Sequence, residues 1–215
     1  MNDQPQAGQP PLRIRALARG MSAVIARAPF MWPVLKRPTQ RFWDKAAPRW
    51  DTGRDPVERA GPLAAAVERV EPEPRRILEL GTGTGTGALM LAERFPEAEI
   101  WAADLSEEMI RQAQAKVSED QRARLHFEVT DAAALPHEAE SFELVCQLNL
   151  PLYAGQIARV LAPGGYVAIA STLGPRTPYY TPESVLRRRF KRLGLEVLDG
   201  GQAGQGTYFL ARRPG

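Results

Sequence analysis

Residues 77–87 read Ile-Leu-Glu-Leu-Gly-Thr-Gly-Thr-Gly-Thr-Gly, and this run constrains the fold more than any other segment. Its apolar start predicts a buried strand, and glycine then occupies every second position from Gly81 to Gly87. Residues 88–95 follow with the apolar spacing of a helix. Glycines allow a tight turn and a close approach of the backbone to a ligand, and a helix start offers unpaired N–H groups. The run therefore predicts a strand–turn–helix cradle for a nucleotide cofactor.

Strands and helices are predicted to alternate through the rest of the chain. Apolar runs predict strands at 76–80, 99–103, 124–129, 142–147 and 165–171, with a turn at 163–165 before the last of them. Helical spacing predicts helices at 56–70, 87–95, 106–117, 153–161 and 182–193. This order is typical of an α/β fold with a parallel sheet and crossover helices. Residues 195–198 and 207–211 predict two further strands joined by a glycine-rich loop, and thus an antiparallel hairpin at the sheet edge.

The 215 residues fit one α/β domain with an N-terminal extension. We expect a polar, Pro- and Gly-rich disordered tail at 1–11, a basic helical segment at 12–50 and the main domain at 51–215. Within the segment, residues 12–28 have the spacing of an amphipathic helix, and Pro29, Pro33 and Pro38 are expected to break the chain after it.

Charge is distributed unevenly along the chain. In residues 1–43, seven basic residues against Asp3 alone give +6, which leaves −3 for the remainder of a chain whose net charge is +3. The basic segment is open to three interpretations: a lid over the domain, an arm that docks on an anionic membrane surface through residues 12–37, or an arm that binds RNA.

Several classes of protein are disfavoured by composition. The single Cys146 permits no intramolecular disulfide and is typical of a reducing cytosol. With His126 and His137 as the two histidines, we expect no metal site. No run approaches 18 apolar residues, so no membrane-spanning helix is expected. The predicted location is cytoplasmic, with attachment to the inner face of the membrane as an alternative.

The glycine run alone does not identify the cofactor, because Gly83, Gly85 and Ala88 also meet the dinucleotide spacing of a dehydrogenase. Acidic residues around the run favour S-adenosylmethionine. Glu79 precedes the glycines, where a carboxylate would repel a pyrophosphate but could meet a ligand ammonium. Asp104 ends the second strand, where it could accept hydrogen bonds from a ribose diol. Asp131 ends the third strand, where it could accept from an adenine amino group.

Five segments in order resemble the class I S-adenosylmethionine-dependent methyltransferases, in particular the small-molecule branch that includes quinone and lipid methyltransferases. They are Leu-Glu-Leu-Gly-Thr-Gly-Thr-Gly (78–85), Ala-Asp-Leu-Ser-Glu-Glu-Met-Ile (103–110), Thr-Asp-Ala (130–132), Ser-Phe-Glu-Leu-Val (141–145) and Arg-Val-Leu-Ala-Pro-Gly-Gly (159–165). Ala-Pro-Arg-Trp-Asp (47–51) is similar to a segment that brings an aromatic residue to the methionine end, although the residue here is Trp50 rather than the more usual tyrosine.

The resemblance implies a Rossmann-like, mostly parallel seven-stranded sheet with helices on both faces and an antiparallel C-terminal hairpin. It also implies roles for residues around the cofactor: the glycine turn and Trp50 at the methionine, Glu79 at its amino group, Asp104 at the ribose, Leu105 and Met109 beside the adenine, and Asp131 with Ala132 at the adenine edge. The cofactor residues so implied are Trp50, Glu79, Gly81, Thr82, Gly83, Gly85, Asp104, Leu105, Met109, Asp131, Ala132 and Leu148.

The implied reaction is an in-line transfer of the methyl group to a small acceptor of lipid or quinone type, leaving S-adenosylhomocysteine. Alignment of donor and acceptor can supply much of the rate, so a general base is not required. Acceptor-side candidates are Asn149 and Tyr153 after the fourth strand, and His137 as a base, with a plain surface-loop histidine as the alternative. An RNA methyltransferase and a non-catalytic cofactor-binding module remain as alternative functions.

Overall fold

The computed structural model describes residue 20 and residues 29–53 and 55–215. The tail predicted at 1–11 and the helix predicted at 12–28 therefore lie outside the described residues, Gly20 excepted. Across the described ranges, none of the helices combines the length and hydrophobicity that a membrane crossing requires.

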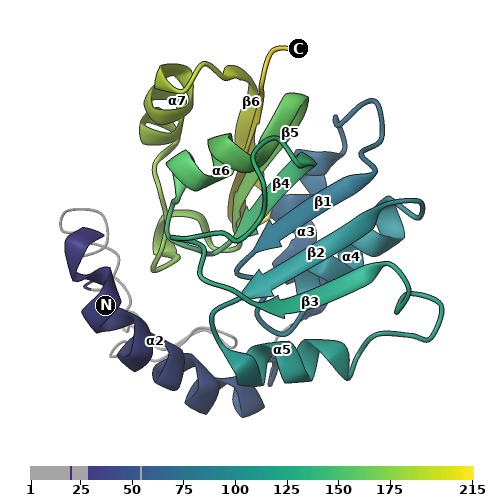
Figure 1. Ribbon diagram of the computed structural model, residues 1–215, viewed down its shortest axis with the longest axis vertical. Helices are drawn as coiled ribbons and strands as arrows, with labels where there is room; N and C mark the ends of the chain where they lie inside the picture. The colour runs from purple at the N-terminus through teal and green to yellow at the C-terminus, as the bar shows by residue number, and fades with distance from the viewer. Residues whose placement is uncertain (1–19, 21–28, 54) are drawn as a thin grey trace.

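One seven-stranded sheet organises the domain (Figure 1). Its strands run in the spatial order β3-β2-β1-β4-β5-β7-β6. The first five lie parallel to one another, and β7 pairs antiparallel with both β5 and β6. The order reverses between β1 and β4, and ligands bind at such a switch point in open α/β sheets. The strands are β1 (Arg76–Leu80), β2 (Glu99–Asp104), β3 (Leu125–Val129), β4 (Phe142–Leu148), β5 (Leu161–Ser171), β6 (Glu196–Ala203) and β7 (Gly206–Arg212).

Helices cover both faces of the sheet because the buried strand residues alternate between two cores. Ile77 packs with α3 (Pro56–Val67) and α4 (Thr86–Arg94) in one core. Its neighbour Leu78 packs with α6 (Ala154–Val160) and α7 (Glu183–Arg192) in the other. The remaining described helices are α2 (Trp32–Ala46), α5 (Glu107–Gln114) and the short 3-10 turns η1 (Pro29–Met31), η2 (Ala47–Arg49) and η3 (Gly174–Arg176). The predicted fold class is thus confirmed.

Two predicted turns are wrong. The turn expected at 163–165 lies inside β5, which already begins at Leu161; the register with β4 shifts there, and Gly164 has φ +75°. The glycine-rich loop expected between the last strands is mostly strand, since Gly200 and Gly201 pair with β7 and the turn is at 204–205. A Cβ on Gly200 would lie 3.1 Å from Glu183 Oε1. Glycine at this position therefore lets β6 pack closely against Glu183 and does not mark a loop.

The break predicted at Pro33 and Pro38 is also wrong, because α2 runs through both positions as one helix. Pro33 lies in the first turn, where a missing N–H costs little. Pro38 removes an interior hydrogen bond, and the neighbouring Thr39 hydroxyl donates to the carbonyl oxygen of Leu35 at 2.8 Å. Contacts between α2 and the domain, described below, hold the helix together despite this loss.

Candidate functional site

A cavity of about 340 Å³ opens at the carboxyl ends of β1, β2 and β4, the edge at which the strand order reverses. Of the predicted site residues, thirteen line it: Trp50, Glu79, Gly81, Thr82, Gly83, Asp104, Leu105, Met109, Asp131, Ala132, Leu148, Asn149 and Tyr153. The sequence thus predicted most of one wall of a single cavity.

The glycine turn after β1 is built from left-handed backbone. Gly81, Gly83 and Gly85 have φ of +72°, +55° and +85°, a region that other residues rarely adopt. The amides of Gly81 and Thr82 donate to the carbonyl oxygen of Ala103 at 2.8 and 3.0 Å, which fixes the turn against the end of β2. A Cβ on Gly83 would approach the Trp50 indole nitrogen to 3.6 Å and Met109 Sδ to 4.0 Å, so this glycine keeps the cradle open.

Gly85 does not line the cavity, in contrast to its predicted role beside the methionine. It is the N-cap of α4. A Cβ there would lie 3.0 Å from Ala113 Cβ and 3.5 Å from the Phe127 ring. Gly85 therefore allows α4 to start close against α5 and β3, while Thr86 and Gly87 beyond it do line the cavity.

Asp104 braces the glycine turn from the end of β2. Its carboxylate accepts from the Gly83 amide at 2.9 Å and from the Ser106 amide at 2.9 Å. Burial raises the pKa of Asp104, while these amide hydrogen bonds oppose that shift. The carboxylate is thus held at the cavity wall by two neighbouring loops.

Glu79 is a buried acid next to the carboxyl end of β1. Burial raises its pKa to about 7, the Thr82 hydroxyl that donates to it at 2.6 Å opposes the shift, and nearby Asp104 adds to it. A Cβ on Gly87 would collide with Glu79 Oε1, so the start of α4 must be glycine for this carboxyl group to fit.

Asp131 is already engaged by α2. The Trp32 indole N–H donates to its two oxygens at 2.9 and 3.1 Å, and Lys36 Nζ lies 3.0 Å from Oδ2. The Ala133 amide donates to Oδ1 at 2.9 Å. The carboxylate predicted to bind an adenine amino group thus contacts two residues of α2.

The three acceptor-side candidates have different surroundings. Asn149 exchanges hydrogen bonds with Thr172: its Nδ2 donates to Oγ1 at 2.8 Å and its Oδ1 accepts from the amide at 2.9 Å. Tyr153 lines the cavity, and burial raises its pKa, so its hydroxyl stays protonated at neutral pH. His137 is not at the cavity: its Nε2 lies 2.7 Å from Glu128 Oε1 and its ring packs edge-on against Phe142. The predicted role of His137 as a base is therefore dropped.

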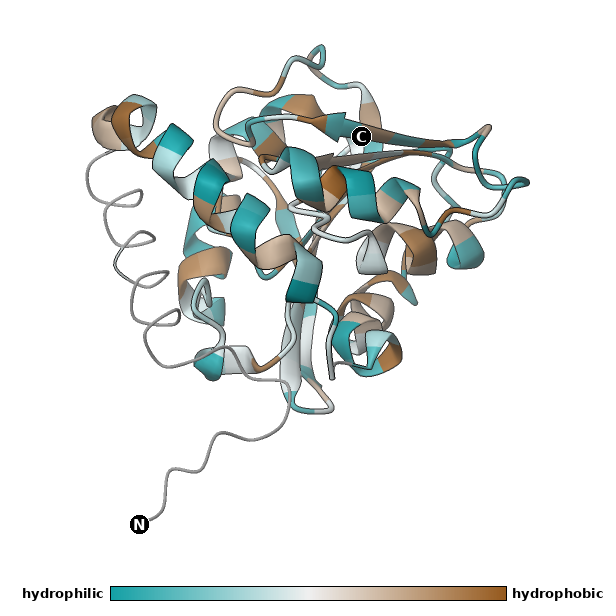
Figure 2. Cartoon of the chain, turned by 90° about the horizontal axis from the view of Figure 1, so that it is seen from below, coloured by the Kyte–Doolittle hydropathy of each residue, from teal (hydrophilic) through white to brown (hydrophobic). Residues whose placement is uncertain are grey.

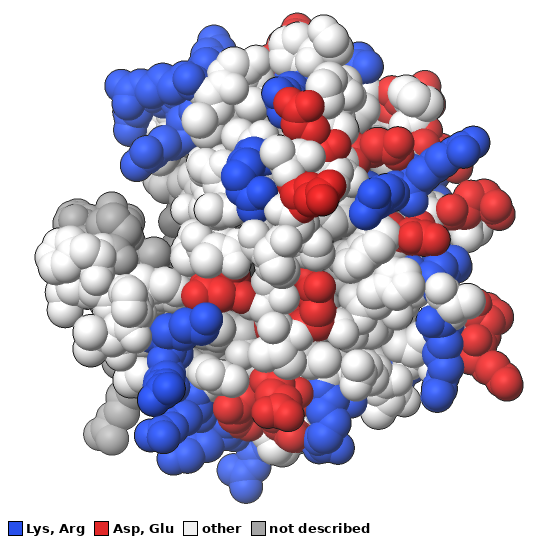
Figure 3. Space-filling model, in the orientation of Figure 1, with Lys and Arg blue, Asp and Glu red and all other residues white. Residues whose placement is uncertain are grey.

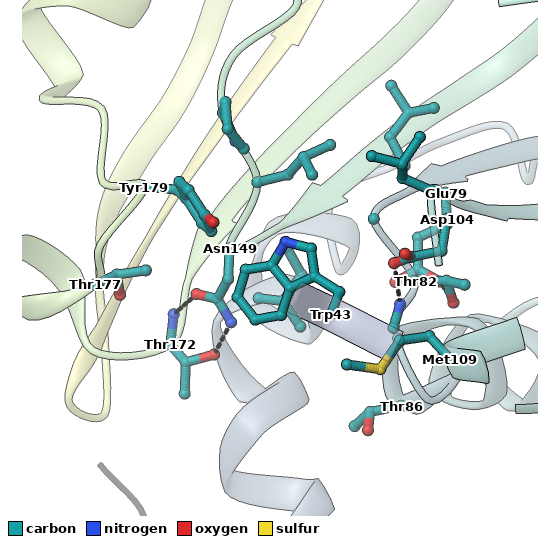
Figure 4. A pocket seen from close by; sticks show the side chains of 18 of the residues that line it. Trp43, Glu79, Thr82, Thr86, Asp104, Met109, Asn149, Thr172, Thr177 and Tyr179 are labelled. Atoms are coloured by element: carbon teal, nitrogen blue, oxygen red, sulfur yellow. Dashed lines mark hydrogen bonds between the residues drawn. The ribbon is translucent and has the colours of Figure 1, made fainter. Parts of the chain in front are cut away.

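Aromatic side chains from outside the predicted set form the opposite wall. Trp43 of α2 packs against Trp50 and Tyr179, with ring centroids 5.3 and 6.2 Å away. Figure 4 shows its ring lying across the cavity, with Asn149 and Tyr179 on one side and Met109 on the other. The density of aromatic residues between Phe30 and Trp50 was the sequence signal for this wall, but its place in space depends on α2 being one continuous helix.

Arg59 is the cavity residue that the sequence did not single out. Among the described lining residues it is the only Lys, Arg or His, whereas the acids are Asp55, Glu58, Glu79, Asp104 and Asp131. Its guanidinium lies 2.7 Å from Asp51 Oδ1 and 5.8 Å from the Trp50 ring centroid. An arginine on an amphipathic helix carries no signal of its own, so only the fold reveals this position.

Asp51 ties the segment containing Trp50 to three elements. Besides Arg59 on α3, its carboxylate accepts from the Thr84 hydroxyl at 2.8 Å and lies 2.5 Å from Lys116 Nζ. These opposite charges and hydrogen bonds lower the pKa of Asp51 against the effect of its burial. Trp50 is thereby fixed over the glycine turn.

The cavity suits a cofactor with a zwitterionic amino-acid end and a nucleoside end. An open glycine cradle leaves room for such a molecule, and the carboxyl groups of Glu79 and Asp104 offer acceptors for its ammonium and its ribose hydroxyls. In the described part of the chain, no group of three or more His, Cys, Asp or Glu side chains has the arrangement of a metal site.

Comparison with known sequences gives related enzymes. The family described as "Methyltransferase domain" matches residues 77–165. A demethylmenaquinone methyltransferase of Deinococcus radiodurans is 32% identical over 182 residues, covering 79% of this chain and 74% of the relative. A malonyl-[acyl-carrier protein] O-methyltransferase of Halorhodospira halophila is 34% identical, covering 66% of this chain but only 50% of the relative. The chain also spans 63% and 44% of the demethylmenaquinone methyltransferases of Thermus thermophilus and Lactococcus lactis.

Solved structures share the fold at low identity. Magnesium protoporphyrin IX methyltransferase from Synechocystis, solved with bound S-adenosylhomocysteine, aligns with a TM-score of 0.64 and 17% identity over 83% of this chain and 99% of that chain. An S-adenosylmethionine-dependent methyltransferase from Aquifex aeolicus aligns with a TM-score of 0.61 and 19% identity over 73% of this chain and 91% of that chain.

Proposed function

The chain belongs to the class I S-adenosylmethionine-dependent methyltransferases, and we propose that it methylates a small, neutral, lipophilic acceptor of quinone or lipid type. Membership implies S-adenosylmethionine as donor and S-adenosylhomocysteine as product. The alternative that the glycine run binds the dinucleotide of a dehydrogenase is therefore rejected. In this scheme residues 51–215 carry out the transfer and residues 29–50 cover the site.

The cofactor roles follow the arrangement of charge around the cavity. Gly81, Thr82 and Gly83 would wrap the methionine end, with Glu79 at its ammonium and Trp50 beside it. Arg59, the lone cation among the described lining residues, would meet the carboxylate of the same end. Asp104 would accept from the ribose hydroxyls. Leu105, Met109, Ala132 and Leu148 supply apolar contacts, and Asp131 would read the adenine amino group.

The observation that carries the acceptor proposal is the combination of aromatic and acidic side chains at one cavity. Trp43, Trp50, Tyr153 and Tyr179 offer flat apolar surfaces next to the glycine cradle. Of the lining acids, Asp55 and Glu58 are not assigned to the cofactor, and these two exposed carboxylates would disfavour an anionic acceptor. This favours a neutral ring, as in the demethylmenaquinone of the Deinococcus relative's name, over a free carboxylate such as the malonyl group of the Halorhodospira relative's name.

When bound, S-adenosylmethionine supplies a methyl group on a positively charged sulfur, which the acceptor attacks in line. The chain contributes alignment and exclusion of water. Trp43 and Tyr179 would hold the acceptor ring flat against the cradle. Tyr153 and Tyr179, whose pKa values burial raises, serve as hydrogen-bond donors rather than bases. The proton released on methylation of a quinol would pass to solvent.

The test is transfer of a radiolabelled methyl group from S-adenosylmethionine to a panel of acceptors. We expect labelling of a reduced demethylated quinone, and little labelling of malonyl thioesters or of RNA. A reaction without the protein provides the blank. Labelling of RNA or a carboxylate but of no neutral lipophilic molecule would refute the acceptor class, and binding of S-adenosylhomocysteine with no labelling of any acceptor would favour the non-catalytic module.

We further propose that α2 brings the site to an anionic membrane surface, where a lipophilic acceptor would reside. Phe30 of η1 and Val34 in the first turn of α2 are 80% and 73% exposed. Figure 2 shows hydrophobic residues at this N-terminal end of the described helix. Exposed Arg37, Arg41 and Lys45 follow along the helix, and basic side chains gather over α2 and again over α7 (Figure 3). Apolar residues beside basic ones are typical of interfacial helices.

Charge reversal tests this docking. A variant with Arg37, Arg41 and Lys45 all replaced by Glu is expected to lose sedimentation with vesicles containing anionic lipid. A control with Arg188, Arg189 and Arg192 of α7 replaced by Glu is expected to keep it, although it carries the same change in net charge. Equal sedimentation of wild type and the α2 variant would overturn the proposal.

A further inference from the structure

The start of α2 places an aromatic N–H donor on the carboxylate proposed for the cofactor's adenine. Trp32 lines the cavity, and its indole N–H bonds both oxygens of Asp131. The Asp131 side chain is only 9% exposed, so this is a largely buried, charge-assisted contact. An indole and an adenine are both flat heterocycles that offer an N–H donor at their edge.

Other donors complete the engagement of Asp131. Lys36, one turn further along α2, lies 3.0 Å from Oδ2, and the Ala133 amide donates to Oδ1. With Trp32 shared between the oxygens, each one already has two close donors. An adenine amino group arriving at this carboxylate would therefore have to compete with the two residues from α2.

The two ends of α2 are held differently. Near its C-terminal end, Asp44 accepts from the Ser106 hydroxyl at 2.6 Å and from the Glu108 amide at 3.4 Å, which joins α2 to the start of α5. Trp43 packs on Trp50 at the same end. Trp32 lies twelve residues away, about 18 Å along the helix axis. Figure 1 shows α2 lying beside the sheet layers, with its C-terminal end next to α5.

We propose that Trp32 is an internal stand-in for adenine: its contact with Asp131 latches the first turns of α2, and arrival of the cofactor's adenine at Asp131 releases them. The C-terminal end, with Trp43 over the methionine end, would stay in place as the pivot. This inference rests on the proposed role of Asp131 at the adenine. Cofactor binding and the release of the first turns of α2 would then be thermodynamically coupled.

Trp32→Phe tests the latch, because it keeps an aromatic ring but removes the N–H donor. The change should strengthen binding of S-adenosylhomocysteine, measured by calorimetry, about tenfold. Trp101→Phe is the matched control: Trp101 packs on His126 and Phe142 and does not line the cavity, so affinity should not change. In an Asp131→Ala background, Trp32→Phe should have no further effect.

Hydrogen exchange gives a readout independent of affinity. Amides of the first turns of α2 should exchange faster when S-adenosylhomocysteine is bound, while those near Asp44 stay protected. Weaker or unchanged binding of S-adenosylhomocysteine by Trp32→Phe would overturn the latch, as would slower exchange at the start of α2 when the ligand is bound. Either result would mean that Trp32 contacts the bound ligand rather than competing with it. Failure of wild type to bind S-adenosylhomocysteine at all would instead refute the proposed cofactor site.

Discussion

Replacing Asp104 by alanine is expected to weaken the binding of S-adenosylhomocysteine by roughly 10- to 150-fold, equivalent to about 1.5–3 kcal/mol for lost charge-assisted hydrogen bonds. The effect should be large because the carboxylate would bind the ligand and also hold the glycine turn. It would accept from the ribose hydroxyls, and it already accepts from the Gly83 and Ser106 amides. Its removal thus leaves the ligand without a partner and the glycine turn without its brace.

A double-mutant cycle separates these two contributions. A 2′-deoxy analogue of S-adenosylhomocysteine should bind wild type more weakly than the parent ligand does, but should bind Asp104→Ala as well as the parent does. Calorimetry supplies the four affinities, and Asp120→Ala, which removes an exposed carboxylate outside the cavity, serves as a surface control. An equal penalty for the analogue in both backgrounds would show that Asp104 supports the turn but does not touch the ribose.

The cradle could be predicted from sequence because each of its parts is local. A buried apolar strand, left-handed glycines and a helix start follow one another within residues 76–94, and their geometry hardly depends on the rest of the chain. The strand ends that carry Glu79, Asp104 and Asp131 follow from the parallel order, since the carboxyl ends of such strands meet at one edge.

The aromatic wall that contains Trp43 could not be predicted, because its position depends on tertiary contacts of α2. Pro38 argues against a helix locally, yet α2 persists because Trp32, Lys36 and Asp44 bind partners far along the chain. For the same reason the sequence could not reveal that Asp131 is engaged by α2. The glycines at 200–201 were likewise misleading, since packing against Glu183 and Tyr208 explains them better than a turn.

The affinity for S-adenosylhomocysteine is expected to fall as the pH is lowered, by about tenfold for each unit below 7 and by about 30-fold at pH 5.5. Burial raises the pKa of Glu79 from 4.5 to about 7. Binding of a ligand ammonium requires the carboxylate, so below pH 7 the protein must release a proton to bind. Glu79→Gln should bind more weakly than wild type at pH 7.5 and should lose this slope.

Folding stability should show the opposite dependence on pH. A raised pKa means that the folded protein holds its proton more tightly than the unfolded chain does. The contribution of Glu79 to stability is therefore greatest below pH 4.5 and is lost as the pH rises through 7, by on the order of 3 kcal/mol. Chemical unfolding of wild type and of Glu79→Gln, both without ligand and across this pH range, separates the contribution of Glu79 from that of the other carboxyl groups.

The ligand 5′-methylthioadenosine tells electrostatic recognition apart from general damage to the cavity, because it keeps the nucleoside but lacks the amino-acid end. Its affinity should not change between pH 5.5 and 7.5, and neither Glu79→Gln nor Arg59→Met should weaken it. Arg59→Met should weaken S-adenosylhomocysteine alone, since the variant keeps the apolar stem and removes the charge opposite the carboxylate. If both ligands lost affinity together, Glu79 and Arg59 would be supports of the fold around the cradle, and the recognition of the amino-acid end would have to come from backbone amides of the glycine turn.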